Sequence, residues 1–353
     1  MNKERHIIEE GASMIDALAR LNSLSGQVMT LLVTDNAGVM KGTLTDGDIR
    51  RALLRGVALD APVAEAMHKE FRFLRDDCVD VSMLREMRRL GLRLIPLLDA
   101  CGRITRLIDT QLTRTVLPVS AILMAGGKGE RLRPMTLTTP KPLLKVGEKA
   151  IIDYNIEALA GVGVKNVWVT TNYLAEQLEE HFATPVGGIE VRCVRETVPM
   201  GTIGSASLVP LAAEGDTIVM NSDLLTTISF EDMYLRHKEE KADVTIAAVP
   251  YNVSVPYAIL DTDGSKVLSL EEKPSYSYYA NAGIYIFSNS LLATLDREER
   301  TDATDLIERA IAEGRRVTYF PINGTWIDVG SPTDFAHAQE LMRHVRLTTS
   351  SAN

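Results

Sequence analysis

A short apolar run that ends in a glycine-rich turn constrains the second half of this chain more than any other feature. Val119 to Met124 has the length and composition of a buried strand. The turn that follows has glycines at 126, 127 and 129. From Val119 onward, strand-like apolar runs alternate with helix-like segments, and this alternation predicts an α/β fold around a mainly parallel sheet.

The glycine turn is suited to binding a polyphosphate. Glycines let backbone N–H groups approach phosphate oxygens without obstruction by side chains, and Arg131 and Lys141 supply positive charge nearby. The turn is not a Walker A loop, because no Gly-Lys-Ser/Thr closes it, and it lacks the third glycine of the dinucleotide fingerprint. The glycines alone therefore leave an ordinary strand-to-helix turn as the alternative.

The complete string is more specific. Gly-Gly-x-Gly-x-Arg-Leu-x-Pro-x-Thr, followed by Pro-Lys-Pro-Leu, resembles the signature of the sugar nucleotidyltransferase family. The resemblance covers nearly all of residues 120–340 and implies a Rossmann-like catalytic domain over residues 119–353. It implies that Lys141 stabilises charge on the phosphorus under attack. It also implies that the nucleotide phosphates are held by Ala125, Gly126, Gly127, Gly129 and Arg131.

A second segment, Glu196 to Thr202, resembles the base-recognition loop of the family, with Gly201 letting the base lie against the backbone. A carboxylate such as that of Glu196 can accept hydrogen bonds from both N1–H and the N2 amine of guanine, whereas uracil and thymine offer only N3–H. Glu196, Gly201 and Thr202 are therefore predicted to bind GTP. The alternatives are a surface acid near a loop, or transfer of a uridylyl, thymidylyl or cytidylyl group.

Two carboxylates match the metal positions of the family. Asp223 follows an apolar run and is predicted to lie at the carboxyl end of a parallel strand, where α/β sheets bind ligands. Asp328 lies in the string Trp-Ile-Asp-Val-Gly. Two carboxylates with phosphate oxygens and waters form a usual Mg²⁺ shell, so the pair is predicted to hold Mg²⁺. Taken singly, each aspartate would more often belong to a turn or a helix cap.

The sugar side of the resemblance is carried by the strings Glu-Glu-Lys-Pro and Asn-Ala-Gly. It implies that Glu272 binds sugar hydroxyls, that Lys273 binds the 1-phosphate, and that Asn281 and Gly283 close the pocket. Tyr257 is followed by alanine where many relatives have glycine, and the extra methyl group leaves the identity of the sugar open. Mannose, glucosamine and heptose are the candidates.

These groups fit one reaction. A sugar 1-phosphate is already anionic, so its attack on the α-phosphate of a nucleoside triphosphate requires no enzyme base. Catalysis then reduces to in-line positioning and to stabilising phosphate charge. The sequence thus predicts transfer of a nucleoside monophosphate to a sugar 1-phosphate with release of pyrophosphate. A catalytically idle nucleotide sensor is the alternative from another class.

Residues 1–118 contain two similar units of about fifty to sixty residues. In each, an amphipathic helix precedes two strands joined by a turn that contains Asp and Gly. This order, with the string Gly-Thr-Leu-Thr-Asp-Gly-Asp-Ile, resembles a tandem CBS-domain pair. The resemblance implies an α+β module in which Thr45 and Asp48 hold the ribose of an adenine nucleotide. A helix cap formed by Thr45 and Asp46 explains the string without a ligand.

The front module carries two further expectations. CBS pairs often dimerise, so a homo-oligomer is expected. A CBS pair ahead of a short transferase also resembles the arrangement in bacterial enzymes that supply GDP-activated amino sugars. The product is therefore expected to be a precursor of surface glycans.

The composition of the whole chain narrows its location and partners. The net charge is -9 over 353 residues, which argues against a nucleic-acid binder. The three cysteines are odd in number and far apart, which favours reduced thiols. The N-terminus lacks the apolar run of a signal peptide, and no stretch approaches the roughly 18 apolar residues of a membrane span. We therefore expect a cytoplasmic protein that does not insert into a membrane.

Overall fold

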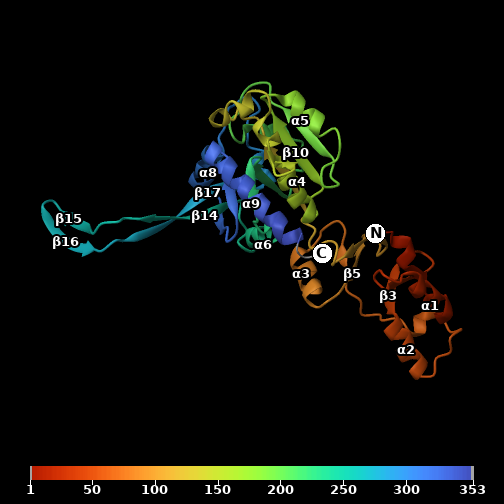
Figure 1. The fold of residues 1–353 in the computed structure, drawn as a ribbon. Helices are drawn as coiled ribbons and strands as arrows, with labels where there is room; N and C mark the ends of the chain where they lie inside the picture. The colour runs from red at the N-terminus through yellow and green to blue at the C-terminus, as the bar shows by residue number, and fades with distance from the viewer. Residues whose placement is uncertain (1, 351–353) are drawn as a thin grey trace. The chain divides into compact units, whose positions relative to one another are not determined.

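The computed structural model describes residues 2–350, and the surroundings of side chains up to residue 343. The chain divides into two compact units (Figure 1). Unit 1 comprises Met1–Pro118 together with residues 161–163, and unit 2 comprises the remainder. Within the described residues, no helix combines the length and the apolar character that crossing a bilayer requires.

Unit 1 consists of two repeats with the same sheet order. In each repeat the first strand pairs in parallel with the second, and the second pairs antiparallel with the third. The first repeat contains β1 (Ile7–Glu9), α1 (Met14–Ser23), β2 (Thr30–Thr34), β3 (Met40–Thr45) and α2 (Asp46–Leu54). The second repeat contains β4 (Leu74–Arg75), α3 (Val81–Arg89), β5 (Leu94–Leu98) and β6 (Ile104–Asp109).

The two repeats share their turn chemistry and pack on each other. The Asp35 side chain accepts hydrogen bonds from two backbone N–H groups in its turn, and Asp99 does the same in the second repeat. Neither repeat can bury a large core alone, so the packing between them is expected. The apolar cluster that includes residues of both repeats contains Leu32, Met40, Leu98 and Ile104.

Unit 2 is built on a seven-stranded sheet with the order β11-β10-β7-β12-β17-β14-β18. Four of its six neighbouring pairs are parallel, and both antiparallel pairs involve β17. The prediction of a mixed, mainly parallel sheet is confirmed. The strands are β7 (Val119–Met124), β10 (Asn166–Thr171), β11 (Val191–Arg195), β12 (Asp216–Asn221), β14 (Val244–Ser254), β17 (Ser275–Ser288) and β18 (Val317–Pro321).

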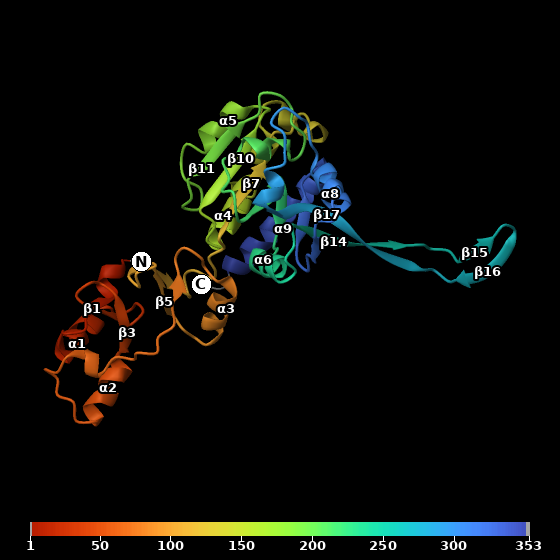
Figure 2. The same cartoon turned by 180° about the vertical axis from the view of Figure 1, so that it is seen from behind.

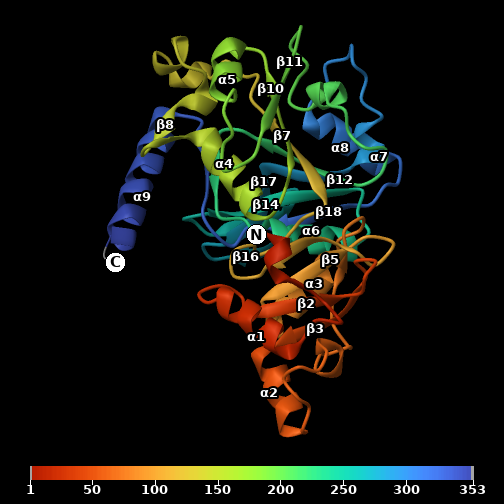
Figure 3. The same ribbon diagram turned by 90° about the vertical axis from the view of Figure 1, so that its right-hand side faces the viewer.

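Helices cover both faces of this sheet. Figure 2 shows α4 and α5 beside β10 and β11, and Figure 3 shows α7 and α8 on the opposite face. The main core joins β12 and β17 to α8 through side chains such as Val219, Phe287 and Leu306.

The helices are α4 (Ile151–Gly161), α5 (Ala175–His181), α6 (Phe230–Glu239), α7 (Asn289–Leu292), α8 (Ala303–Ala312) and α9 (Pro332–Ser350). Short two-stranded sheets pair β8 (Lys145–Val146) with β9 (Lys149–Ala150), β13 (Leu224–Thr226) with β19 (Trp326–Asp328), and β15 (Ile259–Asp263) with β16 (Lys266–Glu271).

β14 and β17 continue beyond the sheet as a two-stranded ribbon. They stay paired as far as Ser254 and Ser275, with one irregularity between Ile246 and Ala248. β15 and β16 close the ribbon at its far end, and Figure 1 shows it pointing away from the rest of unit 2. Residues 250–280, which we call the arm, are nearly all exposed.

Candidate active site

A cavity of about 660 Å³ opens in unit 2 where three neighbouring parallel strands end. Met124 ends β7, Asn172 follows β10 and Asn221 ends β12. The cavity therefore lies at the carboxyl edge of the sheet, where α/β sheets bind ligands. The predicted site residues among its lining are Ala125, Gly126, Gly127, Gly129, Arg131, Lys141, Glu196, Gly201, Thr202 and Asp223.

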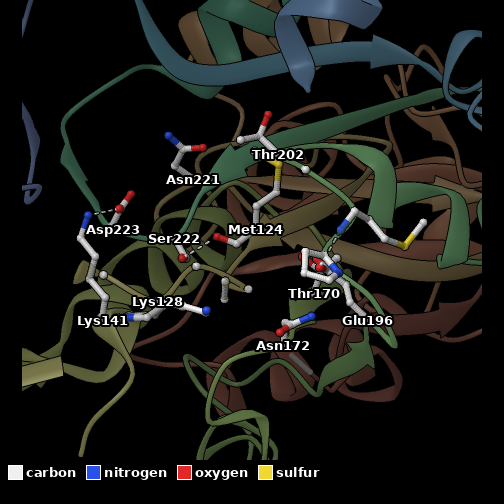
Figure 4. A pocket seen from close by; sticks show the side chains of 18 of the residues that line it. Met124, Lys128, Lys141, Thr170, Asn172, Glu196, Thr202, Asn221, Ser222 and Asp223 are labelled. Carbon is white, nitrogen blue, oxygen red and sulfur yellow. Dashed lines mark hydrogen bonds and ion pairs between the residues drawn. The ribbon is translucent and has the colours of Figure 1, made fainter. Parts of the chain in front are cut away.

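A cluster of three charged side chains joins Lys141 to two aspartates. β13 and β19 pair antiparallel with Leu224 opposite Asp328, and the Val329 N–H donates to the Asp223 carbonyl at 3.1 Å. This pairing holds the two carboxyl groups close together. The buried Lys141 ammonium forms an ion pair with Asp223, as Figure 4 shows, and lies 3.7 Å from Asp328 Oδ1.

The two aspartates are not fully compensated by their surroundings. Burial, and then the nearby Asp223 carboxylate, raise the pKa of Asp328, and Lys141 and Arg131 offset this only in part. In the part of the chain that the structure describes, the Oδ1 atoms of both aspartates are buried and accept no hydrogen bond. Buried oxygens without donors are costly, so the pair favours an additional cation.

The donor set of this pair fits a hard divalent cation. Asp223 and Asp328 present carboxylate oxygens next to a cavity that has room for phosphates, and Mg²⁺ prefers one or two carboxylates together with phosphate and water oxygens. Among the side chains of residues 2–343, no three from His, Cys, Asp or Glu gather to hold a metal by themselves. A metal at this pair would therefore take the rest of its coordination from substrate and water.

Two glycines of the turn pack closely against charged side chains at the two ends of the cavity. Gly129 has φ +59°, and a Cβ there would lie 3.1 Å from the Cβ of Lys141. A Cβ on Gly126 would lie 3.0 Å from Glu196 Oε1. The glycines thus have a packing role in addition to the predicted approach of phosphate, because a side chain at either position would displace Lys141 or Glu196.

Glu196 lies at the other end of the cavity from Lys141 (Figure 4). Burial raises the pKa of its carboxyl group, although the Met200 N–H, which donates to Oε2 at 3.3 Å, and Asn172 act in the opposite direction. One end of the cavity therefore has Lys141 and the aspartates beside it. The opposite end has the buried Glu196 carboxylate, which can accept further hydrogen bonds.

Backbone packing fixes the loop that contains Gly201. This residue has φ +82°, and a Cβ would lie 2.4 Å from the Thr301 carbonyl oxygen. The Thr202 N–H donates to Asp302 Oδ1 at 2.9 Å, and the Thr202 hydroxyl accepts from the Ala303 N–H at 2.8 Å. The structure thus adds a packing requirement at Gly201 to the predicted need for space beside a base.

The predicted sugar-binding residues are divided between two places. Gly283 passes so close to Asn221, at the cavity edge, that a Cβ would lie 2.4 Å from Asn221 Nδ2, and Asn281 Oδ1 accepts from the Gly283 N–H at 3.0 Å. Glu272 and Lys273 are exposed on the arm and do not line the cavity of their own chain. Of the four predicted sugar-binding residues, the structure therefore places only Asn281 and Gly283 near the cavity.

Motif matching missed several residues that line the cavity. Lys128 lies inside the glycine turn, and Arg300 and Asp302, which form an ion pair at 2.8 Å, approach from the segment before α8. Asp302 caps α8 in a capping box with Asp305, and that box is visible in the sequence. The sequence does not indicate, however, that this helix end lies beside the glycine turn.

Unit 1 has a separate cavity of about 540 Å³, lined by residues of both repeats. Thr45 lines it and also caps α2. Asp48 does not line it, because its carboxylate accepts hydrogen bonds from the Thr45 N–H and hydroxyl at 2.8 and 2.6 Å. The capping partner of Thr45 is thus Asp48, whereas Asp46 forms an ion pair with Arg50.

The incompletely compensated charge of Asp328 predicts that Asp328→Asn raises thermal stability. The folded pKa of Asp328 lies above its unfolded value. The ionised group therefore costs stability above the folded pKa, and this cost disappears as pH falls towards the unfolded pKa. By calorimetry without divalent ions, the variant should melt about 1–3 °C higher at pH 7. The difference should vanish in acid. The exposed control Asp261→Asn should melt like the wild type, and a lower melting temperature for Asp328→Asn would show that the Asp328 charge does not destabilise the fold.

Curated relatives match the part of the chain that contains this cavity. Mannose-1-phosphate guanylyltransferase catalytic subunit beta from Drosophila pseudoobscura pseudoobscura is 32% identical over 224 residues, which cover 61% of this chain and 60% of that protein. The protein of the same name from Dictyostelium discoideum is 33% identical over 226 residues, 62% of each chain. The chain thus spans about three fifths of the length of these relatives.

A solved structure with the same fold and a family model also match the part of the chain that forms unit 2. HddC from Yersinia pseudotuberculosis complexed with GMP-PN shares the fold with a TM-score of 0.50 and 21% identity, covering 64% of this chain and 99% of that one. The family model described as nucleotidyl transferase matches residues 120–344. Because this match covers more than half of the 353 residues, the chain belongs to the nucleotidyl transferase family.

Proposed function

We propose that this chain transfers GMP from GTP to a sugar 1-phosphate, forming a GDP-sugar and pyrophosphate. One observation carries the proposal: a single cavity is lined by the glycine turn, by the Lys141–Asp223 ion pair and, at the opposite end, by Glu196. Such a cavity has one end suited to a triphosphate and an acceptor suited to guanine. The similarity to mannose-1-phosphate guanylyltransferases supports the same reaction.

The reaction requires no base from the protein. An anionic oxygen of the sugar 1-phosphate forms a bond to the α-phosphorus of GTP, and the bond from that phosphorus to the bridging oxygen of the β-phosphate breaks. The electron pair leaves with pyrophosphate, and no proton is transferred. The protein then has to align the two phosphates and stabilise the charge that develops between them.

Lys141 and Arg131 are the cations that support this role. Lys141 lies beside both aspartates, and Arg131 lies near Asp328, since a Cβ on Gly330 would be 3.0 Å from its Nη2 atom and 3.4 Å from Asp328 Oδ1. Asp223 and Asp328 would hold Mg²⁺, which when bound supplies Lewis-acid stabilisation of phosphate charge. With Mg²⁺ bound to the aspartates, the Lys141 ammonium can leave them and bind a phosphate oxygen of the nucleotide.

Glu196 is proposed to select the base. Its carboxylate can accept both N1–H and the N2 amine of guanine, and the other common bases lack this pair of donors. Because the side chain is buried, a base without matching donors leaves the carboxylate unpaired, at a cost of about 1–3 kcal/mol. The site therefore favours GTP over UTP, dTTP and CTP.

Mannose 1-phosphate is the first sugar to test, because the relatives are named for it. Glucosamine 1-phosphate and heptose 1-phosphate are the alternatives, and the product would serve as a precursor of surface glycans. Tyr257 and Ala258, where the sequence departs from the family, lie on the arm and not in the cavity lining. Sugar selection therefore depends on where the arm lies during the reaction.

For unit 1 we propose an adenine-nucleotide site of the kind that tandem CBS-domain pairs form. Its cavity has a volume in the range of small-molecule sites and is lined by both repeats. The cations available for a phosphate group are Arg72 and Arg93, and His68 lies on the same lining. The matching strand order of the two repeats supports such a pair.

The proposed activity predicts a specific pattern of pyrophosphate release. GTP, UTP, dTTP and CTP are each combined with mannose, glucosamine and heptose 1-phosphates and Mg²⁺. GTP should exceed the other nucleotides at least about tenfold with one of the sugars.

Lys141→Ala should lower kcat about a thousandfold, because the developing phosphate charge loses its buried cation. Lys145→Ala, an exposed lysine nearby, should keep the wild-type rate. No release with any pair, or normal turnover by Lys141→Ala, would refute the proposal.

The buried state of Glu196 predicts a pH-dependent affinity for GTP. Its raised pKa means that the carboxyl group protonates at a pH where an exposed glutamate is still ionised. Because protonation removes an acceptor, the KM for GTP should rise as pH falls through this pKa. Glu196→Gln should lower kcat/KM about 10–100-fold and lose this component of the pH profile, whereas the exposed control Glu190→Gln should match the wild type. Identical profiles for wild type and Glu196→Gln would rule out the role.

The site proposed for unit 1 predicts heat on titration of AMP into the full chain, with the unit 2 cavity saturated by GTP. Arg93→Ala should weaken this binding about tenfold, because a cation lining the cavity is lost. Arg89→Ala, an exposed arginine of α3 outside the lining, should not weaken it. Absence of heat with AMP, ADP and ATP would show that the site does not bind adenine nucleotides.

A further inference from the structure

Asn155 is a buried polar side chain of α4 that does not line the cavity. Its residue is only 2% exposed, and its amide nitrogen donates to two backbone carbonyls of another segment. The distances are 2.9 Å to the Leu224 oxygen and 3.4 Å to the Ser222 oxygen. These two residues flank Asp223, so a single amide holds the backbone on both sides of one of the two aspartates.

The pairing of β13 with β19 explains why the Leu224 carbonyl needs a donor from outside the sheet. Because the Val329 N–H donates to the Asp223 carbonyl, Leu224 and Asp328 form a non-hydrogen-bonded pair of the antiparallel ladder. The Leu224 carbonyl therefore points away from β19. In the described sheets β13 has no second neighbouring strand, and Leu224 is fully buried. The Asn155 amide thus satisfies a carbonyl that would otherwise be buried without a donor.

The remaining contacts of residues 222–224 leave this segment little freedom. The N–H and the hydroxyl of Ser222 both donate to the Met124 carbonyl, at 3.3 and 2.7 Å, and Figure 4 shows the hydroxyl contact. The first and third carbonyls of the segment accept from Asn155, and the middle one accepts from Val329. With all three carbonyls bonded, the backbone fixes the direction in which the Asp223 side chain leaves it.

The position of this carboxylate matters because the proposed metal site has only two protein ligands. Asp328 belongs to β19, and the Lys141 ammonium contacts both aspartates. A cation bound by two carboxylates requires both to be held at a suitable separation. Residues that orient the ligands of a metal typically change its affinity when they are lost.

A second buried asparagine makes the same kind of contact at a place without a proposed ligand. Asn289 is 5% exposed, and its amide nitrogen donates to the Ala212 and Glu214 carbonyls at 2.9 and 3.1 Å. None of these three residues lines the cavity. Each asparagine therefore stabilises a turn of unit 2, but only the turn held by Asn155 contains a residue of the site.

We propose that Asn155 is a positioning residue for the metal: by donating to the carbonyls on both sides of Asp223, it holds that carboxylate where it can share a divalent cation with Asp328. The role rests on the proposed function, in which these aspartates hold Mg²⁺. The Glu196 end of the cavity has no contact with Asn155, so the loss of this amide acts on the metal and spares the recognition of the base.

Metal affinity tests the proposal without any assay of activity. Mn²⁺ is titrated into the full chain without nucleotide, and the free ion is measured by electron paramagnetic resonance. Asn155→Leu keeps the size of the side chain and removes its donors, so the Kd for Mn²⁺ should rise about 10–100-fold. Asn289→Leu removes donors of the same kind and should keep the wild-type Kd, although both variants should melt at a lower temperature.

Two further variants make this titration decisive. Asp223→Asn defines the background of Mn²⁺ bound elsewhere. Asn155→Ser, whose hydroxyl is too short to reach either carbonyl, replaces the leucine variant if that protein does not fold. Wild-type Mn²⁺ affinity in the Asn155 variant would overturn the proposal, and so would a wild type that binds no more Mn²⁺ than Asp223→Asn.

The Mg²⁺ dependence of pyrophosphate release separates positioning from a general loss of stability. In Asn155→Leu the Mg²⁺ concentration that gives half the maximal rate should rise about 10–100-fold. The KM for GTP at saturating Mg²⁺ should stay within about twofold of the wild type. A purely structural role would lower the amount of active enzyme in both asparagine variants and leave their Mg²⁺ dependence unchanged, which would contradict the proposal. The expected Mn²⁺ result without any pyrophosphate release would refute only the proposed function.

Discussion

The proximity of two half-buried carboxyl groups, with one lysine beside both, is the constraint on which the site depends. The β13–β19 pairing sets Asp223 next to Asp328, and Lys141 supplies the charge that makes this arrangement tolerable in the free protein. The compensation is incomplete, as the raised pKa of Asp328 shows. Under the proposed function, such a site sacrifices some stability and gains affinity for a cation and for the phosphates that accompany it.

The glycine turn connects this charged end to the recognition end of the cavity. Gly129 packs on Lys141 and Gly126 packs on Glu196, so one short segment sets the positions of the proposed phosphate-binding cation and of the proposed base-binding acceptor. The distance between the two ends is thereby fixed by backbone. A nucleotide bound in one orientation could therefore contact Glu196 through its base and Lys141 through its phosphates.

The sequence predicted the fold of unit 2 and the residues of the cavity in those places where a motif lies in one continuous segment. The glycine turn with Lys141, the Glu196 loop and Asp223 were recognised in this way, and the structure brings them into one cavity. Arg300 was missed, because its position depends on how the segment before α8 packs against the loop of Gly201. The strings of Glu272 and Lys273 were recognised, but their position depends on the course of the arm, which no local pattern determines.

A crystal structure with a non-hydrolysable GTP analogue and Mg²⁺ would show whether one nucleotide contacts both ends of this cavity. We expect the triphosphate to lie against the glycine turn, with the metal bound by Asp223 and Asp328 and the Lys141 ammonium turned from the aspartates to a phosphate oxygen. We also expect guanine beside Glu196. A triphosphate bound elsewhere on unit 2, with the Lys141 cluster unchanged from the free protein, would contradict this expectation.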